Sequence, residues 1–212
     1  MPNYPARFPV PSVRRLPVYL RLLKRRVAEG ERQISSTAIA AELDLDPTQV
    51  RKDIALVRVT GTPRVGYPTA KLILAIERFL GWDRLLPAAL VGVGNLGRAL
   101  LGYNGFASTG IAIVAAFDTD PAKAGMSLHG RTILPMSSLA SEAKRHGVRL
   151  GIIATPAVGA QAAVERLVAL GIRGVWNFTP VRLETPSNVA VENVDLSTSF
   201  AALSFRLAQS KR

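Results

Sequence analysis

One glycine-rich turn constrains the fold of this chain more than any other feature. It follows the apolar segment 88–91, precedes a segment of helical character, and reads Gly92-Val93-Gly94-Asn95-Leu96-Gly97. The first glycine permits a tight turn, the second lets the backbone approach a pyrophosphate, and the third lets helix and strand pack closely. Amides at the start of the helix would then face the phosphates. The segment predicts a dinucleotide-binding strand–turn–helix unit, with residues 92–97 against the cofactor.

An acidic residue stands where the ribose of such a nucleotide would lie. The apolar segment 111–117 is expected to be the next strand, and it ends in Phe117-Asp118, about 20 residues beyond the turn. A carboxylate there would hold a ribose 2′-hydroxyl and repel a 2′-phosphate, which favours NAD(H) over NADP(H). Two alternatives stay open: the glycines serve only the turn, or the turn holds another adenine nucleotide, coenzyme A.

The remaining pattern after residue 85 is that of an α/β domain. Further apolar strands are expected at 150–154 and 174–178, with helices between the strands, most clearly at 158–170. This alternation predicts a parallel, Rossmann-type sheet over residues 85–190. Apolar residues recur at helical spacing over 195–209, so residues 191–212 are expected to form a separate C-terminal segment with an amphipathic helix.

The first 84 residues show helical periods instead. Apolar residues spaced four and three apart predict a helix from about Leu16, with Pro17 in its first turn and residues 1–11 as a flexible arm. Serine N-caps predict a second helix through residue 43, and Asp46-Pro47 starts a third. A β-hairpin wing is expected over 60–68, followed by a helix at 69–80 that ends at Gly81. The layout is that of a winged helix-turn-helix domain.

The charge of the chain favours a polyanionic partner. The formal net charge is +12, and residues 1–28 hold seven basic and no acidic residues. The chain has no cysteine, which excludes disulfides and thiolate sites. It shows no signal-peptide pattern and no run of about 18 apolar residues. We expect no metal, no membrane association and a cytoplasmic location.

The polar face of the third helix and the wing are the candidate DNA-reading surface. The N-terminal end of a recognition helix meets base edges, where arginine and lysine suit guanine and glutamine suits adenine. An arginine at a wing tip can reach a minor groove or a phosphate. The expected DNA-binding residues are Gln49, Arg51, Lys52, Arg58 and Arg64.

An enzyme is the weaker interpretation. A dehydrogenase needs a proton donor, and the only histidines, His129 and His146, stand near a turn and near a helix end. About 34 residues follow the strand expected at 174–178, fewer than a separate substrate domain usually needs. No catalytic residue is therefore expected. A small NAD-dependent oxidoreductase and a coenzyme A-binding module remain the alternatives.

Several segments together resemble the Rex family of redox-sensing transcriptional repressors, in colinear order over nearly the whole chain. They are Gln49–Asp53, Val65–Tyr67, Leu90–Gly97, Tyr103 with Gly105-Phe106, Phe117–Asp120, Gly171–Gly174, Asn177–Pro180 and Val191–Asp195. The resemblance implies a homodimer on a palindromic operator in double-stranded DNA, released when NADH binds and with NAD⁺ as competitor. It also implies that the C-terminal helix swaps between subunits.

The resemblance extends to single residues. Tyr103 would pair with Asp195 in one state, and Arg21 would pair with Asp195 of the partner subunit in the other. We also expect Thr155, Pro156, Asn177, Tyr103 and Asp195 in the nucleotide site.

The chain departs from the family pattern at three places. The recognition helix continues as Ile54-Ala55-Leu56-Val57-Arg58, where the family usually has Leu-Ser-Tyr-Phe-Gly. The wing carries Pro63-Arg64 where a basic residue and glycine are usual, and Leu196 replaces a frequent phenylalanine near the nicotinamide. These changes would affect the choice of operator and the response to the redox state of the nicotinamide ring.

Overall fold

The computed structural model describes residues 9–209, and the chain divides into two compact units, Met1–Arg84 and Leu85–Arg212. The expected arm therefore lies mostly outside the described residues, because its residues 1–8 are not among them. Each unit has its own core and is described by itself.

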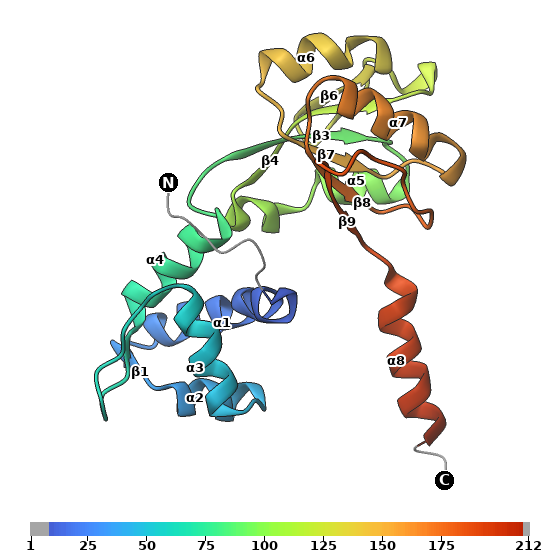
Figure 1. Ribbon diagram of the computed structural model, residues 1–212. Coiled ribbons are helices and arrows are strands. Elements are labelled where there is room, and N and C mark those ends of the chain that lie inside the picture. The colour runs from blue at the N-terminus through green and yellow to red at the C-terminus, as the bar shows by residue number, and fades with distance from the viewer. Residues whose placement is uncertain (1–8, 210–212) are drawn as a thin grey trace. The chain divides into compact units, whose positions relative to one another are not determined.

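The first unit is a helical domain with a small antiparallel sheet (Figure 1). Leu16, Leu20 and Leu23 are buried at the expected spacing and form a core with Val50 and Ile54. Its helices are α1 (Val10–Ala28), α2 (Ser36–Leu43), α3 (Pro47–Leu56) and α4 (Thr69–Leu80). The arrangement confirms the helix-turn-helix expected from the sequence.

The helix ends follow the local sequence signals. The Ser35 side chain accepts a hydrogen bond from the Ala38 amide, and the Asp46 side chain accepts from the amides of residues 48 and 49. Gly81 ends α4 with φ at 72°, a left-handed conformation that glycine adopts without strain. These three caps confirm the expected boundaries.

The position of Pro17 contradicts the sequence expectation. Helix α1 begins at Val10, so Pro17 lies inside it and not in its first turn. An interior proline removes one backbone hydrogen bond and costs about 3 kcal/mol. The early start also brings Ser12 into a buried position ahead of Leu16.

The wing is built differently from the expected hairpin. Within 60–68 there is one bridge, between Thr62 and Gly66. The longer pairing joins β2 (Tyr67–Pro68) to β1 (Gln33–Ile34), a segment between α1 and α2 that the periodicity did not mark as a strand. The expectation missed this strand because a two-residue strand has too few residues to show alternation.

The second unit is a Rossmann-type sheet, as expected. Its strand order is β5-β6-β4-β3-β7-β8-β9, and all neighbours are parallel except the pair β5–β6. The order reverses between β3 and β7, the switch point at which such sheets bind ligands. The strands are β3 (Leu86–Val91), β4 (Ile111–Asp118), β5 (Ser127–Leu128), β6 (Arg131–Pro135), β7 (Leu150–Ile153), β8 (Gly174–Asn177) and β9 (Ala190–Asn193).

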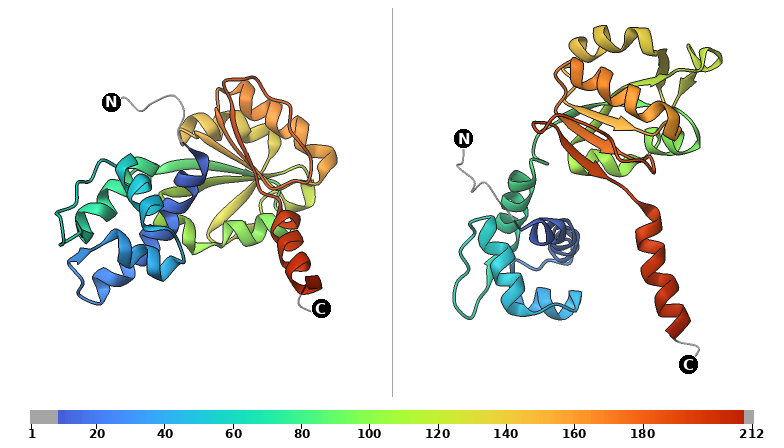
Figure 2. Two further views of the ribbon diagram at one scale, coloured as in Figure 1. Left: turned by 60° about the horizontal axis from the view of Figure 1, so that its bottom comes forward. Right: turned by 45° about the vertical axis from the view of Figure 1, so that its right-hand side comes forward.

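Helices cover both faces of this sheet (Figures 1 and 2). Helices α6 (Leu139–Arg145) and α7 (Ala157–Ala169) lie on one face, and α5 (Asn95–Leu101) lies on the other. Alternate residues of β3 enter the two cores: Ala89 and Val91 pack toward α6 and α7, while Ala88 and Leu90 pack toward the other face. Short 3₁₀ segments connect the elements at Asn104–Thr109, Pro121–Lys123 and Met136–Ser138.

The sheet continues further along the chain than the sequence predicted. Strand β9 spans the boundary expected between residues 190 and 191, and the last helix, α8 (Leu196–Gln209), follows it directly. The sequence did not mark β9 as a strand because Ala-Val-Glu-Asn is neither apolar nor regularly alternating. Phe200, Leu203 and Phe205 of α8 are exposed. The side chain of Leu196 lies outside the described part of the chain.

Candidate nucleotide and DNA sites

The glycine turn lies at the switch point of the sheet. Gly92 follows β3 with φ at 95°, and a Cβ there would lie 2.6 Å from the backbone carbonyl carbon of Ala154 at the end of β7. Only glycine allows this approach of the two strand ends. The turn is therefore held where a nucleotide would cross the sheet edge.

The other two glycines of the turn have opposite surroundings. A Cβ on Gly97 would lie 2.0 Å from the carbonyl oxygen of Gly92, so this glycine serves the packing of α5 on the turn. A Cβ on Gly94 would have no heavy atom within 4 Å. The fold itself does not need a glycine at residue 94, whereas a pyrophosphate lying on the backbone would.

A pocket beside the turn contains an unpaired hydroxyl. Its cavity volume is about 210 Å³, and its lining includes Val91, Thr155, Pro156 and Val158. The Thr155 Oγ1 atom is buried and has no hydrogen-bond partner within the described structure. A buried unpaired hydroxyl costs about 1–3 kcal/mol, so a polar ligand group would remove this cost. Val158 at the pocket mouth is 94% exposed.

Asp118 is placed at the end of β4 beside the turn. Its Oδ2 atom accepts hydrogen bonds from the Val93 amide (2.8 Å) and from Lys123 Nζ (2.9 Å), and its Oδ1 accepts from the Asp120 amide (2.9 Å). Burial alone would raise the pKa of Asp118, but the hydrogen bonds from the two amides and from Lys123 outweigh it and lower the pKa. The carboxylate is charged and keeps lone pairs on Oδ1 for a ribose hydroxyl.

Asn177 has a structural place that the sequence did not reveal. Its Nδ2 donates to the Val181 carbonyl (2.9 Å) and to Asn193 Oδ1 (2.8 Å), and its Oδ1 accepts from the amide and hydroxyl of Thr179. Both of its amide hydrogens and its oxygen are used inside the protein. The side chain connects β8, β9 and the loop between them and has no free donor for a nucleotide.

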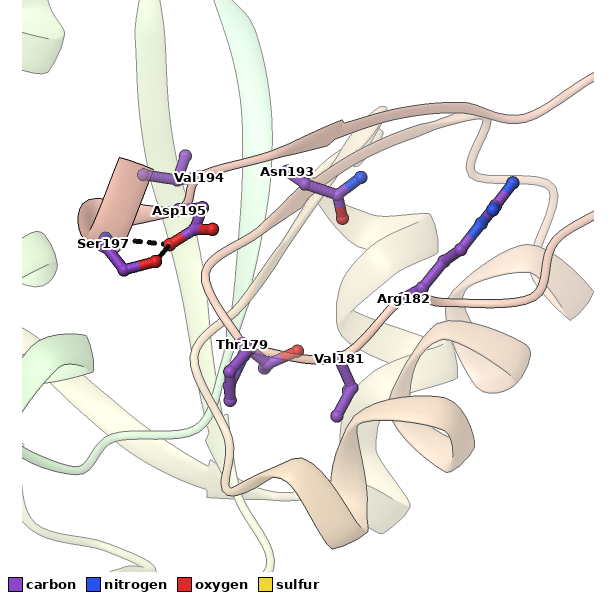
Figure 3. Close-up of a pocket in the computed structure, with 8 residues that line it drawn as sticks. Thr179, Val181, Arg182, Asn193, Val194, Asp195 and Ser197 are labelled. Atoms are coloured by element: carbon purple, nitrogen blue, oxygen red, sulfur yellow. Dashed lines mark hydrogen bonds between the residues drawn. The ribbon is translucent and has the colours of Figure 1, made fainter. Parts of the chain in front are cut away.

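A second pocket lies next to this connection (Figure 3). It has a cavity volume of about 580 Å³, and Asp195 and Ser197 line one end while Arg182 extends at the other. The Asp195 carboxylate accepts hydrogen bonds from the Ser197 amide (2.8 Å) and hydroxyl (2.5 Å). Asp195 therefore caps the start of α8, a role that the sequence did not predict.

The residues of the expected switch are exposed or belong to different units. Tyr103 is 60% exposed, and its ring packs edge-on against Phe106 at 5.0 Å between centroids. Arg21 is an exposed residue of α1 in the first unit. The pairing of either residue with Asp195 remains a prediction.

The residues expected to read DNA are not equivalent in the structure. Arg51 and Lys52 are exposed on α3, as the helical spacing predicted, and Arg51 Nη2 donates to Thr48 Oγ1 at 3.0 Å. Gln49 is half-buried, and its Nε2 donates to Asp53 Oδ1 at 2.8 Å. Gln49 was expected to lie mostly outward. The sequence could not show that the buried Asp53, one turn further along the helix, accepts a hydrogen bond from it.

Arg58 and Arg64 share an unusual backbone conformation. Their φ angles are 57° and 63°, in the left-handed region, which costs about 1–2 kcal/mol in a residue with a Cβ. Both are exposed, Arg58 just beyond α3 and Arg64 in the turn of the wing. Strain at two exposed cations on the expected DNA-reading surface supports a function for their side chains.

Two participants were missed by sequence reasoning. One is Lys123, which contacts Asp118. The sequence signal that could have identified it is its position in a short turn five residues after that acid. Arg15 pairs with the buried Asp53 across α1 and α3. A lone acid on the inner face of a predicted helix is the signal that could have found this pair, because such acids need a partner.

Within residues 9–209 no group of three or more His, Cys, Asp or Glu residues could hold a metal ion, and none of the helices there is long and apolar enough to cross a membrane. His146 lies at the end of α6 with its Nε2 3.2 Å from Glu142 Oε2, the capping position that the sequence suggested.

Comparison with known families divides the chain at nearly the same place as the structure does. Residues 83–181 match the family described as CoA binding domain. Residues 7–55 match the family described as putative DNA-binding protein N-terminus.

Relatives match over almost the whole chain. A redox-sensing transcriptional repressor Rex from Treponema denticola is 44% identical over 193 residues, covering 91% of this chain and 92% of that protein. Its namesake from Bacteroides fragilis is 40% identical over 199 residues, covering 94% and 90%.

Solved structures show the same fold. The crystal structure of RSP in complex with β-NAD⁺ and operator DNA superposes with a TM-score of 0.91 at 29% identity, over 98% of this chain and 95% of that one. The structure of RSP in complex with β-NADH gives a TM-score of 0.87 at 29% identity, over 98% and 97%. RSP is described as a Rex-family repressor.

Proposed function

The chain belongs to the Rex family of redox-sensing transcriptional repressors, and from this membership we propose that it binds operator DNA as a homodimer and is released when NADH binds. The observation that carries the nucleotide part is the open space at Gly94 together with the unpaired hydroxyl of Thr155. A glycine that the fold does not need and a hydroxyl that the fold does not satisfy both fit a bound dinucleotide.

The residues around the turn would hold the cofactor. The backbone at residues 92–97 would face the pyrophosphate, Asp118 would accept from a ribose hydroxyl, and Thr155 and Pro156 would line the adjoining pocket. Lys123 neutralises part of the charge of Asp118 without occupying Oδ1. The bound cofactor supplies a nicotinamide ring whose charge differs between NAD⁺ and NADH, and this difference is the signal that a sensor would read.

The proposed response couples this site to the DNA-binding unit. Tyr103 would pair with Asp195 in one state, and Arg21 would pair with Asp195 of the partner subunit in the other. Exchange of one charge partner for another is a two-state switch. The exposed Phe200, Leu203 and Phe205 of α8 would be buried against the second subunit.

The DNA-binding surface comprises exposed cations on α3 and the wing. Arg51 and Lys52 would contact base edges, and Arg58 and Arg64 would contact phosphates or a minor groove. We also propose that the protein catalyses no reaction and acts in the cytoplasm. Support for the first point comes from relatives named as repressors and from the position of His146 as a helix cap.

Operator binding titrated across NADH/NAD⁺ ratios tests this function. Fluorescence anisotropy of a labelled operator duplex should fall as the NADH fraction rises and remain high in NAD⁺ alone. Gly94→Ala is the matched control, since it should bind DNA normally and respond only at much higher NADH concentrations. Equal effects of NADH and NAD⁺ would contradict redox sensing.

A second candidate ligand follows from the family match of residues 83–181 to a CoA binding domain. Calorimetry with NADH, NAD⁺ and coenzyme A separates the two. Binding of coenzyme A, with loss in Gly94→Ala and without NADH binding, would favour the coenzyme A-binding module. Turnover of a hydroxy acid with NAD⁺ would instead favour the oxidoreductase.

A further inference from the structure

A buried carboxylate lies on the inner face of α3, the helix expected to read DNA. Asp53 has 0% relative exposure, although aspartate is almost never fully buried without partners. It is one helical turn after Gln49, on the face of α3 that packs against α1. A charged group in this position needs an explanation beyond the packing of apolar residues.

Four donated hydrogen bonds surround this carboxylate. Arg15 Nε donates to Oδ2 (2.6 Å) and Arg15 Nη2 donates to Oδ1 (2.9 Å). Tyr19 Oη donates to Oδ2 (2.6 Å), and Gln49 Nε2 donates to Oδ1 (2.8 Å). An ionised carboxylate has about four lone-pair sites, so Asp53 is saturated. Burial alone would raise the pKa of Asp53, but the hydrogen bonds that it accepts, first those from Arg15 and Tyr19, outweigh this effect and lower the pKa.

The charge on Asp53 fixes the orientation of the Gln49 amide. An ionised carboxylate only accepts hydrogen bonds, so the amide must turn its nitrogen toward Asp53 and its Oε1 away from it. Within the described residues, Gln49 Oε1 takes part in none of the hydrogen bonds of this network. Gln49 is half-buried, and its neighbours Arg51 and Lys52 are exposed. The side chain therefore offers an oriented acceptor at the N-terminal end of α3.

We propose that Asp53 is a positioning residue for operator recognition, which holds Gln49 so that its Oε1 accepts from an exocyclic amino group in the major groove. This inference rests on the proposed function. The groups that match such an acceptor are N6 of adenine and N4 of cytosine. Pre-orientation matters because a free glutamine amide can rotate to present either its donor or its acceptor.

Tyr19 provides a matched control inside the same network. It binds Asp53 through Oδ2, whereas Gln49 binds through Oδ1. Tyr19→Phe removes one hydrogen bond to the carboxylate and leaves the Gln49 contact in place. Asp53→Asn places an amide opposite Gln49, which removes the requirement that the Gln49 nitrogen face inward.

The experiment measures base preference with the full chain. Each base pair of an operator half-site is replaced in turn, and affinities are measured by anisotropy together with a non-operator duplex and the melting temperature. In Gln49→Ala, the ratio of affinities for the original and the replaced base pair should fall about 10-fold at one A·T or C·G position. Its affinity for the non-operator duplex should not change. Asp53→Asn should lose discrimination at that same position, while Tyr19→Phe should lower the melting temperature and keep the base preference.

Two outcomes would overturn the inference. One is that Asp53→Asn weakens every duplex by the same factor as it does the operator. The other is that Tyr19→Phe changes base preference as much as Asp53→Asn does. A wild-type chain that binds no duplex would instead contradict the proposed function, so the two failures are distinguishable.

A measurement on the unmutated protein covers the case in which Asp53→Asn does not fold. The side-chain amide resonance of Gln49 is assigned by its loss in Gln49→Ala. In the wild-type chain one of its protons should exchange slowly with solvent, because it is bonded to a buried carboxylate. Exchange as fast as that of an exposed glutamine would overturn the inference.

Discussion

The nucleotide turn and the DNA-reading surface both contain left-handed backbone, but only the DNA-reading surface has arginines in this conformation. At the turn, Gly92 has φ at 95° and a Cβ would lie 2.6 Å from the backbone of Ala154. At the recognition helix and wing, two left-handed positions are Arg58 and Arg64, where the resembled family usually has glycine. The wing also keeps one left-handed glycine, Gly66 with φ at 100°, where a Cβ would meet the backbone of Ile34. The difference shows that a left-handed position in contact with other backbone excludes every side chain. A left-handed position without such a contact admits a side chain at the cost of local strain.

The largest effect is expected for Gly97→Ala. The added Cβ would lie 2.0 Å from the Gly92 carbonyl oxygen, so the turn or α5 must move. We expect a loss of about 3 kcal/mol in the free energy of unfolding and no NADH binding. Thermal unfolding and calorimetry measure the two effects. Unchanged stability would show that the turn can shift freely and that contact with other backbone does not exclude a side chain there.

Gly94→Ala tests the same turn without internal crowding, because its Cβ would meet no heavy atom within 4 Å. We expect an unchanged melting temperature and an NADH affinity lowered about 10- to 100-fold, since the methyl group would occupy the path of the pyrophosphate. DNA binding in the absence of cofactor should equal that of the wild type. Normal NADH affinity would place the nucleotide elsewhere.

Arg64→Gly should have two effects of opposite sign. Relief of the left-handed strain should raise the free energy of unfolding by about 1 kcal/mol. Loss of one phosphate contact should weaken DNA binding and reduce the slope of log affinity against log salt by about 1. Arg58→Gly offers the same relief at a second position. If both variants gain stability and bind DNA as before, the strain has no function in DNA binding.

The smallest effect is expected from pH, through Asp118 at the nucleotide turn. Hydrogen bonds from two amides and Lys123 lower its pKa below the ordinary value. The ionised group therefore adds stability above about pH 4, and this contribution is lost as the pH falls through the lowered pKa. Asp118→Asn should be less stable at pH 6 and show a flatter decline in melting temperature toward pH 3. Parallel declines would mean that the carboxylate contributes nothing there.

The sequence predicted the features that depend on neighbouring residues. The caps at Ser35, Asp46 and Gly81, the turn from Gly92 and the apolar faces of α1 and α4 follow from patterns within a few positions. The fold class rests on these local signals, whereas the family resemblance rests on the colinear order of several segments, among them Leu90–Gly97.

The features that it could not predict depend on contacts between distant segments. Strand β9 is defined by its pairing with β8, and the pairing of β1 with β2 joins segments about 34 residues apart. The inward turn of Gln49 depends on Asp53, and Asp53 in turn depends on Arg15 of another helix. Asn177 resembles a ligand-binding residue in sequence, but Asn193 and Val181 use its amide hydrogens.

The bonds of Asn177 also determine where the C-terminal segment can bend. Its side chain holds Asn193, and its backbone carbonyl accepts from the Val194 amide at 2.8 Å. The chain is thus clamped to the sheet up to Val194, one residue before the acid that caps α8. Val194 is the last residue held in this way before α8, and it also lines the pocket in Figure 3. A reorientation of α8 would therefore bend the chain beside this pocket, and a small displacement there would become a large one at the far end of the helix.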